Sequence, residues 1–375
     1  MRIYLDNAAT TPVDERVIET MVDALRLTDG NPSSIHQEGR TARAAIEHAR
    51  RQIARSLNAS IGEIFFTSGG TESSNMALKR AVQDLGVRRI ISARTEHHCV
   101  LHSLDALIKE QDLEVVFVDQ NSDGHIQLEH LEALLQQKGT KTLVSLMHAN
   151  NEIGTLMDLV KVSALCTQHD ALFHTDTVQT IGFYPIDVSQ LNIAFLTGSA
   201  HKFHGPKGIG FIYINNSNIV HPYIDGGSQE RNMRGGTEHI SGILGMAKAL
   251  ELATVEMESR QAYIKELRDY FAQQLQSQIP DLEFNGDPFG QGHYKILSVG
   301  FPLSQRADLL LLNLDIAGVA ASGGSACSSG VDVGSHVMDA LKRGSLRQTL
   351  RFSFSHLNTK EEVDQVLVKL KEILG

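Results

Sequence analysis

TGSAHKFHGPKGIG, residues 197–210, joins two apolar runs of the chain, one at residues 193–196 and one at residues 209–214. This pattern predicts a strand, a reactive turn and a second strand. Lys202 lies in the turn among small residues, where loss of hydration would favour its neutral amine. Such an amine is a nucleophile for a carbonyl or aldehyde cofactor. A solvated turn lysine is the alternative, and these residues alone do not separate the two.

Composition sets the broad class of the protein. The chain has 375 residues, 42% of them hydrophobic, which is enough for a sizeable core and two domains. Its 34 basic and 44 acidic residues give a net charge of −10 without long runs of either sign, so we expect no nucleic-acid partner. No apolar stretch reaches the about 20 residues of a membrane span, and the start lacks a signal-peptide pattern. We therefore expect no membrane partner and a cytoplasmic location. The three cysteines form no CxxC pair, which fits a reducing compartment.

Strand and helix patterns alternate along most of the chain. The predicted strands are residues 63–67, 89–93, 114–118, 142–147, 171–174, 193–197 and 208–214. Alternation of this kind predicts an α/β fold with a largely parallel sheet covered by helices on both faces. One long helical pattern, residues 243–275, leads into a smaller α+β unit. Its closing helix begins at a capping box formed by Thr359 and Glu362.

The sequence SGGT directly after the first of these strands is a candidate anion site. At such a strand-to-helix turn, free backbone N–H groups and the hydroxyl of Thr71 can converge on an anion, with Gly70 as a second contact. A simple helix N-cap by Thr71 is the alternative. The stretch matches neither a Walker A loop nor a GxGxxG fingerprint, which argues against a Rossmann-type nucleotide binder.

Asp176 ends another apolar strand, in HTDTVQ, with Gln179 three residues later. A carboxylate at the carboxyl end of a strand points into the crevice where α/β proteins bind ligands. It could hold a pyridinium N–H and keep a cofactor ring protonated as an electron sink. An N-cap for the next segment is the alternative. Asn151 and Glu152 also follow a strand, and taken alone they are explained by a turn.

Four further residues carry candidate chemistry. His97, in TEHHCV, is best explained as a ring that stacks on a flat cofactor, because no second ligand cluster at zinc spacing accompanies it. His201 fits a phosphate contact better than a metal site.

Cys327 lies in a stretch, residues 318–336, in which ten of nineteen residues are Gly or Ser, so a mobile segment with an accessible thiol is predicted. A flexible linker with an incidental cysteine is the alternative. Arg351, in an otherwise apolar strand, needs a carboxylate to pair with.

Ten motifs in order give the chain a family resemblance. They are YLDNAATTP, NPSSIH, TSGGTES, TEHHCV, NNEIGT, HTDTVQTIG, SAHKFHGPKGIG, GGSQERNMRGGT, SGGSACSS and LRFSFS. With them the chain resembles the group I, NifS/IscS-like cysteine desulfurases, which are pyridoxal-phosphate-dependent enzymes of the class V aminotransferase family and fold type I. The resemblance implies a large cofactor-binding domain, residues 14–257, with a mainly parallel seven-stranded sheet flanked by helices. It implies a smaller α+β domain, residues 1–13 and 258–375, that carries the cysteine loop.

The resemblance also implies roles for single residues. The residues expected to bind the cofactor are Gly70, Thr71, His97, Asn151, Asp176, Gln179, Ser199, His201, the Schiff-base lysine Lys202 and, from the partner subunit, Thr237. Lys202, His97 and the sulfur-accepting Cys327 are the expected catalytic residues, while Asn151 and Arg351 orient the substrate. No metal site is expected, although Cys327 is placed to contact an iron–sulfur cluster during transfer.

The implied activity is conversion of L-cysteine to L-alanine with transfer of sulfur to Cys327 as a persulfide, for iron–sulfur cluster assembly or tRNA thiolation. A homodimer with shared active sites and a sulfur acceptor protein are the implied partners. A selenocysteine lyase or another aminotransferase-like enzyme is the alternative within the family, and a catalytically silent sulfur-carrier-binding scaffold is the alternative outside it. Retention of Lys202 and Cys327 argues against the scaffold.

The chain departs from the family pattern at three places. Asn232 stands where the family has a glycine, and Ser355 stands in Ser-Phe-Ser where the family has Ser-Leu-Gly. Both put the local backbone geometry in doubt. The sequence also stops at Gly375, directly after its closing helix, without the tail by which some members dock a scaffold protein. The argument for a scaffold protein as a partner of this chain is therefore weaker.

Overall fold

A seven-stranded sheet forms the larger part of the molecule. The structure is a computed structural model and describes residues 2–303, 309–323, 335–342 and 347–375, so Cys327 lies outside the described residues. The strand order is β2-β8-β7-β6-β5-β3-β4. The strands are β2 (Ile64–Thr67), β3 (Arg89–Ser92), β4 (Glu114–Phe117), β5 (Thr142–Ser145), β6 (Leu172–Asp176), β7 (Phe195–Ser199) and β8 (Gly210–Ile214). Only β8 runs antiparallel to its neighbours, which confirms the predicted mainly parallel sheet.

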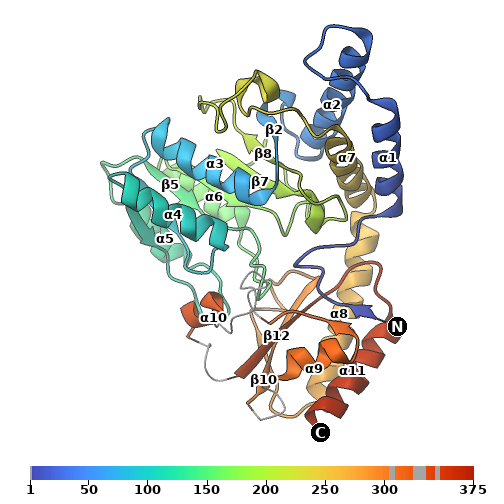
Figure 1. The fold of residues 1–375 in the computed structure, drawn as a ribbon. Helices are drawn as coiled ribbons and strands as arrows, with labels where there is room; N and C mark the ends of the chain where they lie inside the picture. The colour runs from blue at the N-terminus through green and yellow to red at the C-terminus, as the bar shows by residue number, and fades with distance from the viewer. Residues whose placement is uncertain (1, 304–308, 324–334, 343–346) are drawn as a thin grey trace.

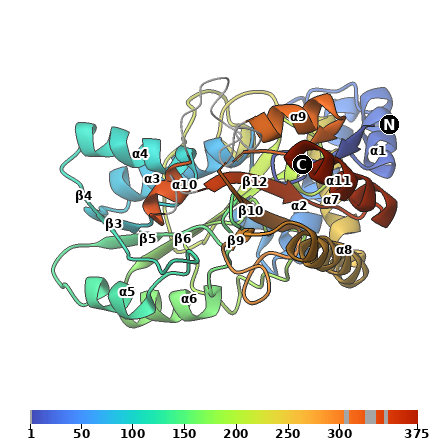
Figure 2. The same ribbon diagram turned by 90° about the horizontal axis from the view of Figure 1, so that it is seen from below.

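Helices cover both faces of this sheet, as predicted. Helices α3 (Gly70–Gln83) and α4 (His98–Glu110) lie on one face, and α5 (Leu128–Leu135) and α6 (Leu159–Gln168) lie on the other (Figure 2). A third layer packs near β2 and consists of α1 (Glu15–Leu27), α2 (Gln37–Ser56) and α7 (Ile240–Val255) (Figure 1). Buried aliphatic and aromatic side chains on both faces form the core, which explains why the central strands read as unbroken apolar runs.

The rest of the chain forms two small sheets. In one, β10 (Ile296–Pro302) pairs antiparallel with β12 (Arg347–Ser353) and β9 (Glu283–Asn285). In the other, β1 (Ile3–Tyr4) pairs with β11 (Val319–Ala320). Helices α8 (Met257–Gln278), α9 (Leu310–Ile316) and α11 (Lys360–Leu374) lie on this side, with both termini (Figure 1), and α10 (His336–Ala340) lies apart. The predicted division into residues 14–257 and residues 1–13 with 258–375 stays a prediction. The capping box of Thr359 and Glu362 is confirmed.

One predicted helix is wrong in the structure. The pattern at residues 243–275 predicted a single helix, but α7 ends at Val255 and α8 begins at Met257, with Glu256 between them at a φ of −97° and a ψ of 9°. The Glu256 carboxylate accepts hydrogen bonds of 2.6 Å from both Arg16 and Arg260. Arg16 belongs to α1, so a partner distant in the sequence holds the backbone where the break occurs. The apolar periodicity of the sequence continues through the break, so the sequence pattern alone does not reveal it.

The two departures from the family pattern are accommodated locally. Asn232 has a φ of 64°, in the left-handed region that glycine enters most easily and that asparagine also tolerates. Asparagine therefore keeps the backbone conformation that a glycine would allow. Ser355 is buried in a turn, where its hydroxyl accepts a hydrogen bond of 3.2 Å from the backbone N–H of Leu357. The serine thus stabilises the turn that follows β12.

Replacing Glu230 with alanine is expected to lower the free energy of unfolding by about 3–5 kcal/mol, the usual cost of removing one partner of a buried ion pair. Arg50 donates two hydrogen bonds to this carboxylate, of 2.7 and 3.0 Å, and both side chains are almost fully buried. The backbone N–H of Phe66, in β2, is a third donor at 2.8 Å. Urea unfolding measures the loss. Glu47, a more exposed partner of the same arginine, is the control, and its replacement should cost under about 1 kcal/mol. Equal losses in the two variants would contradict the prediction.

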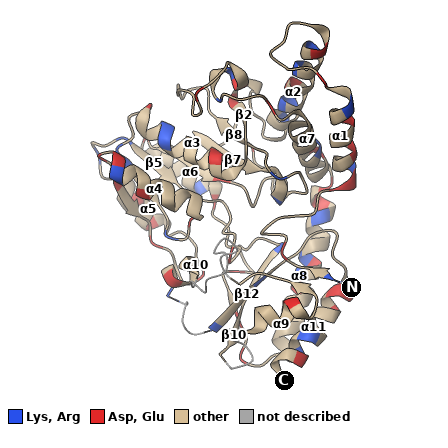
Figure 3. Ribbon diagram, viewed as in Figure 1, with Lys and Arg blue, Asp and Glu red and all other residues tan. Residues whose placement is uncertain are grey.

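Charged residues are mixed over the outer helices. Figure 3 shows basic and acidic segments interspersed on these helices. In the described part of the chain, no helix is both long enough and apolar enough to cross a bilayer.

Candidate active site

A cavity of about 330 Å³ lies at the carboxyl ends of strands β6 and β7. Ten of the predicted site residues line it: Gly70, Thr71, His97, Asn151, Asp176, Gln179, Ser199, His201, Lys202 and Arg351. Thr237 is exposed and does not line this cavity of its own chain. The carboxyl ends of parallel strands meet at one edge of a sheet, which explains why residues from distant motifs converge here.

Lys202 lies in the 3-10 helix η2 (Ala200–Lys202), directly after β7. Its Nζ donates hydrogen bonds to the carbonyl oxygens of Ala8 at 2.7 Å and Ala9 at 2.8 Å. The same N-terminal segment is held to the turn by Thr11, whose hydroxyl donates to the carbonyl oxygen of His201 at 2.9 Å. The amine is therefore half-buried and oriented toward the cavity, and the alternative of a fully solvated turn lysine does not hold. The sequence pattern of the N-terminal motif YLDNAATTP did not predict that it positions the lysine.

Asp176 ends β6 as a buried carboxylate. Its Oδ1 accepts a hydrogen bond of 2.9 Å from the backbone N–H of Val178, so the carboxylate also orders the turn that follows. Burial raises the pKa of Asp176 to about 6, and the nearby charge of Lys202 partly offsets this rise. A buried carboxylate needs a cationic N–H partner to stay ionised. A protonated pyridine nitrogen is such a partner, so this position fits a pyridinium cofactor.

The first turn of α3 presents free backbone N–H groups at the other end of the cavity. Its N-cap is Gly69, with a φ of 152° and no side-chain cap, so the alternative that Thr71 is the N-cap is wrong. A Cβ added to Gly70 would lie 2.7 Å from a methyl carbon of Val178, so only glycine fits there. Uncapped N–H groups and the helix dipole favour an anion. Ser199 and His201 line the same cavity, and the set of donors fits a phosphate group.

Two neutral imidazoles lie at the cavity wall. The Nδ1 of His97 accepts the backbone N–H of Cys99 at 3.1 Å and thereby caps α4. Burial lowers the pKa of His97 to about 4, with a smaller effect from the charge of Lys202. Burial likewise lowers the pKa of His201 to about 4. A neutral, flat ring at His97 can stack on an aromatic cofactor without the cost of burying an ion.

Gln179 offers a further sign of what the cavity accepts. Its amide nitrogen donates to the carbonyl oxygen of Ala8 at 2.9 Å, while its Oε1 is buried and has no hydrogen-bond partner in the part of the chain that the structure describes. A buried acceptor without a donor is costly unless a ligand satisfies it. A hydroxyl on a cofactor ring would do so. Together with Asp176 and the first turn of α3, this residue makes the cavity fit pyridoxal phosphate.

Arg351 projects from β12 into the same cavity and is 1% exposed. Its Nη1 donates to the carbonyl oxygen of Asn151 at 2.7 Å, and its Nη2 donates to Asp6 Oδ1 at 2.8 Å. The carboxylate that the sequence led us to expect for this arginine is therefore supplied by Asp6, which sequence reasoning missed. A guanidinium has five N–H donors, so others remain for a substrate carboxylate.

Lys295 was also missed, and no motif marks it. It is fully buried, its Nζ has no hydrogen-bond partner among the described residues, and it lies 3.8 Å from the ring centroid of Phe183. Burial, with the charges of Lys202 and Arg351, lowers its pKa well below the usual value. The ring contact would favour an ammonium by about 2 kcal/mol. Burial of an ion costs several kcal/mol, so burial favours the neutral form of this amine.

Replacing Lys295 with methionine is expected to raise the free energy of unfolding by several kcal/mol at pH 7, because it removes an unsatisfied buried amine. At this pH the unfolded chain binds a proton at Lys295 more strongly than the folded chain does, because burial lowers the pKa of the amine. The amine therefore destabilises the fold below the unfolded pKa of about 10.4, by up to about 1.4 kcal/mol more for each pH unit of decrease. Unfolding at several pH values measures this slope, which the methionine variant should lose. Exposed Lys207, replaced by methionine, is the control; an unchanged slope at Lys295 would contradict the prediction.

The two described cysteines are poor nucleophiles. Cys166 is fully buried in the core, and burial raises its pKa to about 12. Cys99 lines the cavity, but burial also raises the pKa of its thiol, and the charges of Asp176 and Glu96 raise it further. The thiolate is the reactive form. At neutral pH neither thiol is therefore suited to attack a substrate, and Cys327 is the third cysteine of the chain.

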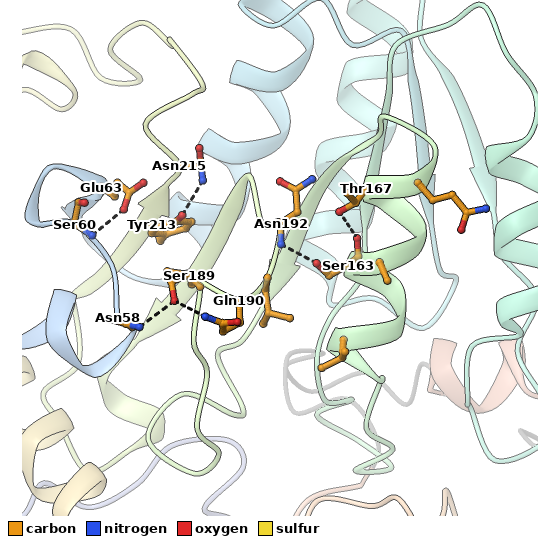
Figure 4. Close-up of a pocket in the computed structure, with 15 residues that line it drawn as sticks. Asn58, Ser60, Glu63, Ser163, Thr167, Ser189, Gln190, Asn192, Tyr213 and Asn215 are labelled. Carbon is orange, nitrogen blue, oxygen red and sulfur yellow. Dashed lines mark hydrogen bonds between the residues drawn. The ribbon is translucent and has the colours of Figure 1, made fainter.

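A second hollow, lined by residues such as Asn58, Ser163 and Tyr213, is wider than the cavity around Lys202 (Figure 4). Several of its polar groups hydrogen-bond to one another: Asn58 donates to Ser189 at 3.0 Å, and Ser163 accepts the backbone N–H of Asn192 at 2.8 Å. No group of three or more His, Cys, Asp or Glu residues in the described ranges could hold a metal ion. The cavity around Lys202 is therefore the candidate active site.

Comparison with known proteins agrees with this site. The family description "Aminotransferase class-V" matches residues 3–366. The chain belongs to the class-V aminotransferase family. Within this family, the cysteine desulfurase IscS of Dictyoglomus turgidum (strain DSM 6724 / Z-1310) is 42% identical over 99% of the chain and 94% of the relative.

Two solved structures extend the comparison. A NifS-like protein has a TM-score of 0.92 and 37% identity, covering 100% of this chain and 99% of its own. A structure described as SspA in complex with cysteine has a TM-score of 0.81 and 30% identity, covering 96% of this chain and 100% of its own. This member of the class-V aminotransferase family therefore groups with the cysteine desulfurases along its whole length, and its fold is that of the NifS-like, pyridoxal-phosphate-dependent enzymes.

Proposed function

We propose that this chain uses pyridoxal 5′-phosphate to convert L-cysteine to L-alanine and transfers the sulfur to Cys327 as a persulfide. The observation that carries the proposal is the convergence of Lys202, Asp176 and the first turn of α3 on one cavity, in a chain whose full-length relatives are cysteine desulfurases. SspA has been solved with cysteine, which supports the same substrate here.

The cofactor would be held at three points of the cavity. Asp176 would pair with the ring nitrogen, the N–H groups at Gly70 and Thr71 with Ser199 and His201 would bind the phosphate, and Gln179 would accept the ring hydroxyl. When bound, pyridoxal phosphate supplies an aldehyde for amines and a ring that withdraws electrons from the substrate α-carbon. His97 would cover one face of the ring and keep water away from it.

Three residues would act on the substrate amino acid. Arg351 and Asn151 would orient it, Arg351 by binding the α-carboxylate through N–H groups that Asp6 and Asn151 do not use. Lys202 would hold and move the proton of the α-carbon at its Nζ, because that amine lies in the same cavity, fixed by the carbonyl oxygens of Ala8 and Ala9.

Sulfur would leave the substrate by attack of the Cys327 thiolate. A sulfur–sulfur bond forms, the carbon–sulfur bond of the substrate breaks, and a proton completes the methyl group of alanine, so that cysteine and thiol yield alanine and persulfide. Cys327 follows Ser322 by five positions in the sequence. The hydroxyl of Ser322 binds Asp6, which binds Arg351, and this connection to the cavity supports Cys327 as the attacking thiol.

The wider setting is part of the same proposal. A homodimer would bring Thr237 of one subunit to the phosphate of the other, which its exposed position permits. A sulfur acceptor protein in a cytoplasmic pathway of iron–sulfur cluster assembly or tRNA thiolation would then receive the persulfide sulfur.

The test is a product balance on purified protein loaded with pyridoxal phosphate. With L-cysteine and a thiol reductant, we expect equal amounts of alanine and sulfide. Protein that binds the cofactor, yet forms no alanine from L-cysteine, would overturn the proposal. Alanine from L-selenocysteine alone would assign the selenocysteine lyase activity instead.

A further inference from the structure

A continuous chain of polar contacts connects the two described positions on either side of residues 324–334. On one side, the hydroxyl of Ser322 donates to Asp6 Oδ1 at 2.8 Å. The same carboxylate oxygen accepts Nη2 of Arg351 at 2.8 Å, and Nη1 of that arginine donates to the carbonyl oxygen of Asn151 at 2.7 Å. On the other side, the hydroxyl of Ser335 donates to Glu152, the residue that follows Asn151. Arg351 lies in the middle of this chain.

The end at Ser322 is fixed by backbone as well as side-chain contacts. Ser322 and Arg351 exchange two backbone hydrogen bonds, of 3.2 and 2.7 Å, across an antiparallel bridge. The position of Ser322 is therefore tied to the strand that carries the arginine. Asp6 adds a link between their side chains, so substrate binding at Arg351 and the placement of Ser322 depend on one carboxylate.

The end at Ser335 is fixed to the loop that follows β5. Glu152 is 2% exposed and lines the cavity. Asn150 shapes this loop, because its Oδ1 accepts the backbone N–H groups of Glu152 at 2.8 Å and Ile153 at 3.0 Å. Val337 and Met338 of α10 pack on Ile153 in a small apolar cluster of their own. The described residues just after 334 are thus attached to the cavity wall and not to the small sheets.

We propose that Asp6 and Glu152 are positioning residues for sulfur transfer, which hold both ends of the segment bearing Cys327 to the arginine that receives the substrate carboxylate. The inference rests on the proposed function. Asp6 acts on Arg351 and Ser322 together, so its loss weakens substrate binding and transfer. Glu152 acts at Ser335, so its loss slows transfer alone.

The experiment separates these two effects. The dissociation constant of L-alanine, followed through the absorbance of the bound cofactor, reports binding at Arg351, and single-turnover mass spectrometry reports persulfide on Cys327. We expect Glu152→Ala to slow persulfide formation by about 10²-fold, the usual cost of misplacing a reacting group. Its dissociation constant for L-alanine should change much less than the transfer rate, because the Glu152 carboxylate accepts its hydrogen bond from Ser335 and not from Arg351. Asp6→Ala should raise that constant and slow the transfer.

Conservative variants distinguish positioning from a general structural role. Glu152→Gln keeps an oxygen that accepts the Ser335 hydroxyl and should restore most of the rate, as should Ser335→Thr compared with Ser335→Ala. The losses in Glu152→Ala and Ser335→Ala should be less than additive in the double variant, because both remove the contact between these two side chains, while Ser335→Ala also removes the N-cap of α10. If Glu152→Ala does not fold, the Ser335 pair carries the test. Alkylation of Cys327 by iodoacetamide in cofactor-free protein gives a readout without turnover, and its rate should change in Glu152→Ala.

Failure of the proposed function and failure of the positioning role give different experimental results. Wild-type protein that forms no persulfide would remove the proposed function itself. Wild-type persulfide formation together with a Glu152→Ala variant of equal transfer rate would overturn the positioning role and leave the function intact.

Discussion

Replacing Lys202 with alanine is expected to abolish the near-visible absorbance of the covalently held cofactor and to lower alanine formation by about 10⁴-fold or more. The reason is geometric. The Nζ of Lys202 is fixed by the carbonyl oxygens of Ala8 and Ala9 in the cavity that Asp176 also lines. No other described lysine lines that cavity, so no second amine can take over the proton at the substrate α-carbon. An absorbance scan and an alanine assay measure the two losses.

Lys207 gives the matched control. It lies five residues after Lys202, in the Gly-Pro-Lys-Gly sequence at residues 205–208, and is exposed, so Lys207→Ala should keep the absorbance band and stay within about twofold of the wild-type rate. Circular dichroism of both variants checks that the turn still folds. A coloured and active Lys202→Ala protein would show that the cofactor is bound elsewhere, and the cavity would lose its assignment.

The residues at strand ends were predictable from the sequence. Apolar runs predicted the strands, and parallel strands place their carboxyl ends at one edge, so Asp176 and Lys202 could be expected to meet. The turn around Lys202 was confirmed as a strand, a short 3-10 helix and a second strand, β7, η2 and β8. Local patterns are sufficient in these places because the pattern and the geometry involve the same few residues.

The partners of these residues could not be predicted in the same way. Lys202 is held by backbone carbonyl groups 194 and 193 residues away, and a carbonyl group has no side-chain signature. Asp6 pairs with an arginine 345 residues later, and Lys295 shows no pattern that marks it as buried. The N-cap at Gly69 in place of Thr71 depends on a backbone angle that the composition of SGGT leaves open. Long-range contacts therefore supply what local patterns omit.

Replacing Cys327 with serine is expected to lower persulfide and alanine formation by about 10⁴-fold or more while leaving the absorbance of the bound cofactor unchanged, because the nucleophile is lost and the cofactor site is not. Mass spectrometry of the protein after one turnover measures the persulfide. Cys99 is the matched control, since it is the cysteine that lines the cavity in the described part of the chain. Cys99→Ser should stay within a few-fold of the wild type, and Cys166→Ser tests the buried core position.

The pH dependence provides a second way to separate the two thiols. Burial and the charges of Asp176 and Glu96 raise the pKa of Cys99, so its thiolate fraction is small at neutral pH and grows tenfold for each added pH unit. If Cys99 were the acceptor, the transfer rate would keep rising with pH far above neutrality. We expect no such tenfold rise per pH unit at alkaline pH. A loss of transfer in Cys99→Ser, or a rate that rises steadily to alkaline pH in Cys327→Ser, would move the acceptor role to Cys99.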